Sequence, residues 1–148
     1  MLEKAMILAA TAHMGQLDKG GNPYILHPVR VMLRCNTLEE KIVAMLHDTL
    51  EDSDLTADDL VKEGFSKEIV DAVVTLTRKT EENYMEHIQK VSKNLLATTV
   101  KLSDLADNMD LNRLPGLTPK DFQRLERYLR AKLILEEAQK NRAVLNNI

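Results

Sequence analysis

The sequence predicts an all-α fold, a single-domain bundle of about seven or eight helices over residues 1–148. Aromatic residues make up only 3% of the chain and tryptophan is absent, so the core must be built from aliphatic side chains and methionine. Such a core favours helices over a sandwich or barrel. Strand-like alternation never persists beyond a few residues, whereas helix start and stop signals recur along the chain.

The first part of the chain predicts helices on either side of a strong loop signal. Residues 3–16 form an amphipathic helical pattern that stops at a glycine. Residues 18–23 combine turn formers with a proline and predict a loop. A short helix resumes near Pro28. Thr37, with a glutamate three residues later, forms a capping box that predicts the start of the helix carrying His47.

The rest of the chain predicts five more helices, several of which begin at a hydroxyl side chain suited to an N-cap. They extend from Thr56 to Gly64, from Ser66 to about Thr77, over 84–93, over 95–111, and from Thr118 to about residue 144. In the last of these, proline at the first helical position reinforces the start. The helix over 84–93 is polar around His87, which is therefore expected at the surface.

Charge and composition exclude several classes of protein. A net charge of -3 provides no broad basic field, so no nucleic acid polymer is expected as a partner. The single Cys35 excludes an internal disulfide framework and a cysteine-based zinc site. Residues 1–4 lack the layout of a signal peptide, and no apolar run approaches the roughly 18 residues of a membrane span. The expected location is the cytoplasm, without membrane association.

The densest group of reactive side chains occurs in a segment that is expected to be helical, and consists of His47, Asp48, Glu51 and Asp52. At roughly 100° per residue, these side chains share one side of a helix. The apolar run 42–46 before them predicts that the helix lies in the interior. Buried carboxylates without a partner cost several kcal/mol or become protonated, and a cation would remove that penalty. His47 and Asp48 are therefore expected to bind a divalent cation, beside which the other two carboxylates could handle a water.

Two further segments supply matching side chains. His27 precedes Pro28, which biases its backbone toward an extended conformation, so its ring is expected to project from the start of a helix. Asp104 and Asn108 lie one turn apart on a largely apolar helix. Two imidazoles and two carboxylates would form a mixed nitrogen and oxygen site that suits manganese, iron or zinc and leaves positions for water or a phosphate oxygen.

Four sequence blocks then occur in an order typical of one family. They are Ala12-His13-x-Gly15-Gln16, Gly21-x-Pro23-Tyr24-x-x-His27-Pro28, Leu46-His47-Asp48-Thr49-x-Glu51-Asp52, and Lys101-Leu102-x-Asp104 with Asn108 and Met109. With these blocks the chain resembles the HD-type metal-dependent phosphohydrolases, and within them the hydrolase domain of the Rel/SpoT alarmone enzymes and the small alarmone hydrolases. The resemblance covers residues 12–113, about two thirds of the chain.

The resemblance implies a metal-dependent enzyme that acts on a phosphorylated nucleotide. It implies one divalent metal, Mn²⁺ in preference to Fe²⁺ or Zn²⁺, held by His27, His47, Asp48 and Asp104. The expected reaction removes pyrophosphate from the 3′ position of guanosine tetra- or pentaphosphate, (p)ppGpp, the alarmone of the stringent response. The family's synthetase domain is not expected within these residues, and the sequence leaves a homo-oligomer open.

The resemblance also assigns roles around that metal. It implies that Glu51 and Asp52 position or activate the attacking water, and which of the two accepts the proton stays open. Asn108 is expected to contact the sugar region of the nucleotide. Lys19 is expected to bind phosphate, with a solvated loop lysine as the alternative. Tyr24 is expected to stack on a base, with simple packing as the alternative.

Three carboxylates depart from the family pattern, because Asp18, Asp107 and Asp110 replace residues that are usually basic or neutral there. A highly anionic ligand would be repelled by them. Either another cation compensates for this repulsion, or the substrate is a different nucleotide. A third alternative is a non-catalytic nucleotide-sensing module. The intact Glu51 and Asp52 argue against it, because a binding module does not need a water-activating pair. The candidate cations recur every three residues on the last helix: Arg124, Arg127 and Arg130. The favoured interpretation of this spacing is a solvated face that forms salt bridges within the helix.

Overall fold

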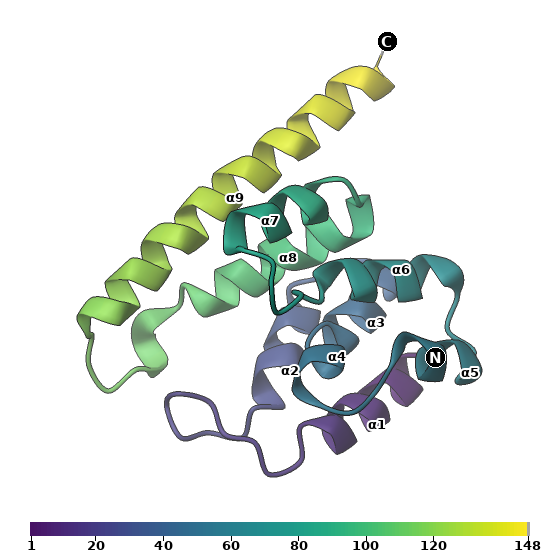
Figure 1. Ribbon diagram of the computed structural model, residues 1–148, viewed down its shortest axis with the longest axis horizontal. Coiled ribbons are helices and arrows are strands. Elements are labelled where there is room, and N and C mark those ends of the chain that lie inside the picture. The colour runs from purple at the N-terminus through teal and green to yellow at the C-terminus, as the bar shows by residue number, and fades with distance from the viewer. Residues whose placement is uncertain (148) are drawn as a thin grey trace.

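The computed structural model describes residues 1–147, which form nine α-helices and one short 3₁₀ helix, η1 (Figure 1). The helices are α1 (Leu2–Ala12), α2 (Leu26–Leu33), α3 (Leu38–Leu46), α4 (Thr49–Asp52), α5 (Ala57–Lys62), α6 (Lys67–Leu76), α7 (Tyr84–Ser92), α8 (Leu95–Asn108), η1 (Leu111–Arg113) and α9 (Pro119–Asn146). Within these residues, β-structure is limited to one isolated bridge between Leu17 and Pro23. The predicted all-α class is confirmed.

Local capping signals placed most helix starts correctly. Thr37, Thr56 and Thr118 each accept a hydrogen bond from the backbone N–H three residues later, in a complete capping box. Ser66 likewise caps α6. Helix ends were less well predicted: α1 ends at Ala12 and α8 at Asn108, each a few residues earlier than expected.

The predicted helix carrying His47 is interrupted, which accounts for the additional helix. α3 ends at Leu46 and α4 begins at Thr49. The His47 ring contacts the Ala44 carbonyl oxygen through Nδ1 at 2.6 Å, and the Thr49 hydroxyl donates to the Leu46 carbonyl at 2.7 Å. These side chains occupy carbonyls that a continuous helix would use for its own backbone hydrogen bonds. The interruption places His47 and Asp48 in a turn between two helices.

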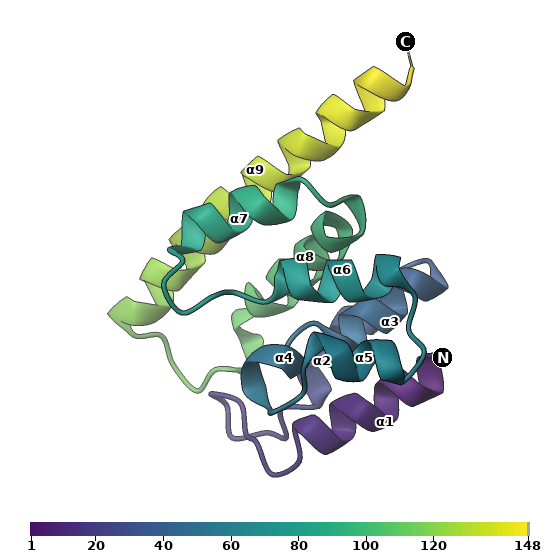
Figure 2. The ribbon, with the colours of Figure 1, turned by 45° about the vertical axis from the view of Figure 1, so that its right-hand side comes forward.

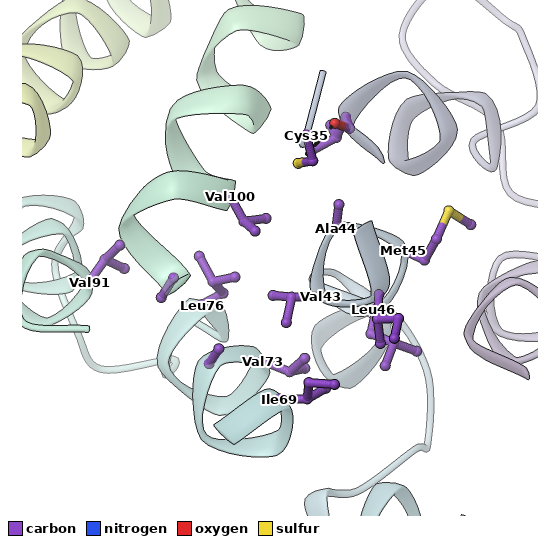
Figure 3. Close-up of a cluster of buried hydrophobic side chains, with 14 of the residues drawn as sticks. Cys35, Val43, Ala44, Met45, Leu46, Ile69, Val73, Leu76, Val91 and Val100 are labelled. Atoms are coloured by element: carbon purple, nitrogen blue, oxygen red, sulfur yellow. Dashed lines mark hydrogen bonds between the residues drawn. The ribbon is translucent and has the colours of Figure 1, made fainter. Parts of the chain in front are cut away.

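Helix α3 lies at the centre of the core, as its apolar run predicted. All five residues of 42–46 are buried, and α3 packs against α1, α2, α6 and α8. Figure 3 shows Val43 pointing toward Val73 and Leu76 of α6 and toward Val100 of α8. Because α2, α3 and α8 also contact one another pairwise, their polar ends are held at one place.

The long helix α9 forms one side of the molecule. It packs on α7 and α8, and its C-terminal part extends beyond them (Figures 1 and 2). Over its 28 residues only Ala131 and Leu135 are buried. The N-terminal part of α9 lies near the loop after α8, where it can contribute side chains to a site (Figure 1). None of the helices in residues 1–147 combines the length and apolar character needed to span a bilayer.

Candidate metal centre

Three buried side chains from three helical elements converge on one point. His27 lies in the first turn of α2, His47 directly after α3, and Asp104 on α8. The His27 Nε2 atom is 3.0 Å from Asp104 Oδ1 and 3.3 Å from His47 Nε2. One potential ligand atom from each of the three residues lies within 4.8 Å of the other two. The structure therefore brings together three of the four predicted metal ligands in a geometry that a single ion could bridge.

The fourth predicted ligand, Asp48, stands at the edge of this group. Its Oδ2 atom is 3.0 Å from His47 Nε2 and 3.6 Å from His27 Nε2. The Tyr24 hydroxyl donates a hydrogen bond of 2.6 Å to the same oxygen. Burial, together with the Asp48 charge, raises the pKa of Tyr24, which keeps the phenol protonated as a donor. Tyr24 thus holds Asp48 in place.

The hydrogen bonds on the far side of both imidazoles indicate that a cation belongs between them. The carbonyl of Ala44 can only accept, so His47 Nδ1 carries the proton at 2.6 Å. His27 Nδ1 faces the Asp107 carboxylate at 2.7 Å and donates in the same way. In the neutral rings, both Nε2 atoms then present lone pairs to each other and to carboxylate oxygens. A divalent cation bound between these atoms would remove the repulsion among the lone pairs and carboxylate oxygens. Imidazole nitrogen and carboxylate oxygen are donors that suit a transition metal.

Asp104 is held by two neighbours on its own helix. Lys101 donates from Nζ to Oδ2 at 2.7 Å, and Asn108 donates from Nδ2 to Oδ1 at 2.9 Å. Burial acts against the charged form, but Lys101 and the two imidazoles together hold the pKa of Asp104 well below its usual value. Burial also acts against the ammonium, yet Asp104 raises the pKa of Lys101 above its usual value. The two groups are therefore an ion pair inside the protein.

The two residues predicted to handle the water differ in position. Glu51 lines a small cavity of about 180 Å³ together with the four predicted metal ligands, and its Oε1 atom accepts the backbone N–H of Arg78. Burial raises the pKa of Glu51, and burial followed by the charge of Asp48 raises the pKa of Asp52. Among the described residues, those lining this cavity do not include Asp52.

A larger cavity of about 420 Å³ adjoins the metal centre and contains all three predicted substrate contacts. Lys19, Tyr24 and Asn108 line it, as does His27. The larger and smaller cavities share four lining residues, Tyr24, His27, Asn108 and Tyr128. Tyr24 and Asn108 therefore both contact a predicted metal ligand and line the larger cavity.

Of the three arginines on α9 that the sequence suggested as compensating cations, one reaches this larger cavity. Arg124 lines it, and donates to Asp121 at 2.7 Å. The Arg127 guanidinium instead lies over the Tyr84 ring, 5.2 Å from its centroid. Arg130 is exposed and pairs with Glu126 at 2.8 Å on the same helix. The sequence pattern could not separate these three positions, because it did not show which face of α9 meets the loop after α8.

The three carboxylates that depart from the family pattern all have partners within the chain. Asp18 accepts the backbone N–H groups of Gly20 and Asn22, both at 2.9 Å, and so organises its own loop. Asp110 caps η1 and lies 3.5 Å from Arg113. Asp107 is fully buried and pairs with two arginines. The repulsion expected from three free carboxylates is therefore reduced by these contacts.

His87 was missed by the sequence reasoning, and the expectation that it lies at the surface is wrong. It is only 2% exposed and lines the smaller cavity. Burial, and then the charges of Lys101 and Lys90, lower the pKa of His87 to about 4, which favours the neutral ring. The available signal was helical spacing, since Ile88 and Val91 mark the buried face of α7 and His87 lies beside them.

Comparison with known proteins agrees with this geometry. The HD domain family matches residues 5–109, well over half of the chain, so the protein belongs to the HD domain family. The match covers all four predicted metal ligands and extends from α1 to the end of α8.

Two individual relatives show which members of the family this chain is similar to. Over 120 residues the chain is 36% identical to a guanosine-3′,5′-bis(diphosphate) 3′-pyrophosphohydrolase of Aquifex aeolicus, which covers 73% of this chain and 17% of that protein. It is 33% identical over 143 residues to the bifunctional (p)ppGpp synthase/hydrolase SpoT of Escherichia coli K12, which covers 85% and 20% respectively. The chain thus spans about a fifth of these relatives' length.

A solved structure supports the fold over nearly the whole chain. A metazoan ortholog of SpoT, described as hydrolysing ppGpp and playing a role in starvation responses, superposes with a TM-score of 0.70. The alignment covers 95% of this chain and 94% of that protein's chain at 21% identity. The helices of this chain are therefore arranged in the same fold as those of the SpoT ortholog.

Proposed function

We propose that the protein is a metal-dependent phosphohydrolase that removes pyrophosphate from the 3′ position of guanosine 3′,5′-bis(diphosphate). The observation that carries this proposal is the buried convergence of His27, His47 and Asp104 beside a cavity lined by cationic side chains. The names of the bacterial relatives supply the substrate class. The reaction consumes one water and yields guanosine 5′-diphosphate and pyrophosphate.

The residues that would hold the metal are His27, His47, Asp48 and Asp104. Combined nitrogen and oxygen donors suit Mn²⁺, Fe²⁺ or Zn²⁺. Of these, Mn²⁺ is our first choice because the resemblance to the alarmone hydrolases implies it. When bound, the ion would neutralise charge on a phosphoryl oxygen and lower the pKa of a water. Tyr24 and Asn108 keep two of the ligands oriented through their hydrogen bonds to Asp48 and Asp104.

We assign the proton acceptor to Glu51 and a supporting electrostatic role to Asp52. Glu51 lines the cavity beside the ligands, and the Arg78 backbone N–H fixes one of its oxygens. Burial raises its pKa, and the charges of Asp48 and Asp52 add to that effect, so the carboxylate accepts a proton more readily. The water oxygen would bond to phosphorus and give its proton to Glu51 as the bond between phosphorus and the 3′ oxygen breaks. The 3′ oxygen would take up a proton from solvent and leave as the sugar hydroxyl.

The larger cavity is proposed to hold the nucleotide. Lys19 and Arg124 would contact its phosphates, Tyr24 its base and Asn108 its sugar region. Lys19 and Arg124 line the same cavity, and burial, followed by the repulsive charge of Arg124, lowers the pKa of Lys19. A shared anion would relieve that repulsion. Arg124 thereby offers the compensating cation that the altered loop at Asp18 requires.

The sequence raised two alternatives to this function. A phosphohydrolase for another nucleotide was suggested by Asp18, Asp107 and Asp110, whose contacts within the chain now weaken that reason. A non-catalytic sensing module would have no need of a carboxylate with a raised pKa beside the ligands, and Glu51 is such a group.

The test is to incubate the Mn²⁺-loaded protein with a panel of phosphorylated nucleotides and identify the products. We expect pyrophosphate and guanosine 5′-diphosphate from guanosine 3′,5′-bis(diphosphate), and no reaction in EDTA. Turnover of a different nucleotide in preference would support the first alternative. Binding of the nucleotide without turnover of any member of the panel would support the second.

A further inference from the structure

A fully buried carboxylate outside the predicted ligand set contacts the metal centre from behind. Asp107 lies on α8 one turn after Asp104, and its side chain has no exposed surface. Its Oδ2 atom is 2.7 Å from His27 Nδ1, the ring nitrogen that faces away from the ligand cluster. The other ring nitrogen, Nε2, is the one that lies near Asp104 and His47.

This contact determines which nitrogen of His27 carries the proton. A carboxylate accepts, so Nδ1 must donate, and the lone pair of the neutral ring is then on Nε2, where the metal would bind. His47 is fixed in the same tautomer, but by the main-chain carbonyl of Ala44. The orientation of His47 is thus set by the backbone, whereas that of His27 depends on one side chain.

Two arginines hold Asp107 in position. Arg30, one turn after His27 on α2, donates from Nε to Asp107 Oδ1 at 2.8 Å and from Nη2 to Oδ2 at 3.1 Å. Arg113 of η1 donates from Nη2 to Oδ2 at 3.3 Å and to the Asp107 carbonyl at 3.0 Å. Two guanidinium groups offset the cost of burying the carboxylate and fix the plane of its oxygens.

We propose that Asp107 is a positioning residue that orients His27 and holds it in its metal-binding tautomer. The inference rests on the proposed metal-dependent function, and Asp107 itself touches neither metal nor substrate. Carboxylates that accept from a metal-bound histidine orient the ring and increase its basicity, and their loss typically weakens metal binding 10- to 100-fold.

The test is Mn²⁺ affinity, measured by calorimetry on the metal-free protein, together with the visible absorption of the Co²⁺ form. We expect Asp107→Ala to weaken Mn²⁺ binding by roughly 10- to 100-fold and to change the Co²⁺ spectrum, because His27 no longer binds in a fixed orientation. Asp107→Asn, which preserves the shape of the side chain, should show a smaller loss. If the alanine variant fails to fold, the Mn²⁺ affinity of Asp107→Asn tests the proposal in its place.

Asp110→Ala is the matched control. It removes a carboxylate of equal charge that also contacts Arg113 but has no contact with His27. It should leave both Mn²⁺ affinity and the Co²⁺ spectrum as in the wild type. Wild-type affinity in folded Asp107→Asn, an equal loss in Asp110→Ala, or an unchanged Co²⁺ spectrum would each overturn the proposal. So would failure of both Asp107 variants to fold, which would make the residue purely structural.

This experiment separates the inference from the function on which it rests. If the wild-type protein binds Mn²⁺ but hydrolyses no nucleotide, the proposed reaction fails and the role of Asp107 can still be measured. If the wild-type protein binds neither Mn²⁺ nor Co²⁺, both proposals are overturned.

Discussion

Removing the Asp104 carboxylate should destabilise the protein even when no metal is present. Lys101 donates to Asp104 at 2.7 Å, and the two side chains are only 14% and 5% exposed. In Asp104→Ala the ammonium would remain buried without its partner. Loss of one member of a buried ion pair costs about 3–5 kcal/mol. For a chain of 148 residues this corresponds to a fall in Tm of roughly 6–20 °C.

The assay is thermal unfolding in EDTA, followed by far-UV circular dichroism. The double variant Asp104→Ala with Lys101→Met should recover most of the lost stability, because both partners of the pair are then removed together. Neither variant should bind Mn²⁺. As a control, Asp71→Ala removes an exposed carboxylate paired with Lys67 and should change the free energy of unfolding by about 0.5 kcal/mol or less. The reasoning fails if Asp104→Ala melts within about 2 °C of the wild type, or if the double variant is no more stable than Asp104→Ala.

Three further predictions concern catalysis, substrate binding and pH. Glu51→Gln should retain Mn²⁺ affinity and lower kcat by roughly 100- to 10,000-fold; unchanged turnover would remove Glu51 as the proton acceptor. Arg124→Ala should raise KM by roughly tenfold or more, whereas Arg130→Ala, on the same helix but away from the cavity, should not; equal effects would exclude a phosphate contact. Because the pKa of His87 is lowered to about 4 in the folded protein, the unfolded state binds more protons between that pH and about 6.5. Neutral His87 therefore contributes at most about 3 kcal/mol to the free energy of unfolding, fully above pH 6.5 and progressively less as pH falls toward 4. The free energy of unfolding of His87→Leu, measured in urea, should decline less over this pH range than that of the wild type.

The sequence predicted those features that local patterns or ordered motifs determine. Capping residues such as Thr37 and Thr118 act within one helical turn, so their helices begin where expected. The chemistry of His27, His47 and Asp104 suggested a mixed nitrogen and oxygen metal site, and the resemblance to the family predicted these residues as its ligands. Their convergence at one point depends on the packing of α2, α3 and α8, which the motifs do not describe.

The features that the sequence did not predict depend on contacts between distant segments. Asp107 was interpreted as a charge that repels phosphate, because its partners Arg30 and His27 are separated from it by more than half the chain. The interruption of the helix at His47 and Asp48 arises from side chains that compete for backbone carbonyls, which helical periodicity does not report. The position of His87 depends on which face of α7 the neighbouring helices cover.

The central claim is that a water attacks the 3′-diphosphate of guanosine 3′,5′-bis(diphosphate) at this metal centre. The most direct measurement is mass spectrometry of the products formed in ¹⁸O-labelled water with Mn²⁺-loaded protein. We predict one ¹⁸O atom in the released pyrophosphate and none in guanosine 5′-diphosphate. Label in the guanosine 5′-diphosphate, release of phosphate from the 5′ position, or recovery of unreacted substrate would contradict the account.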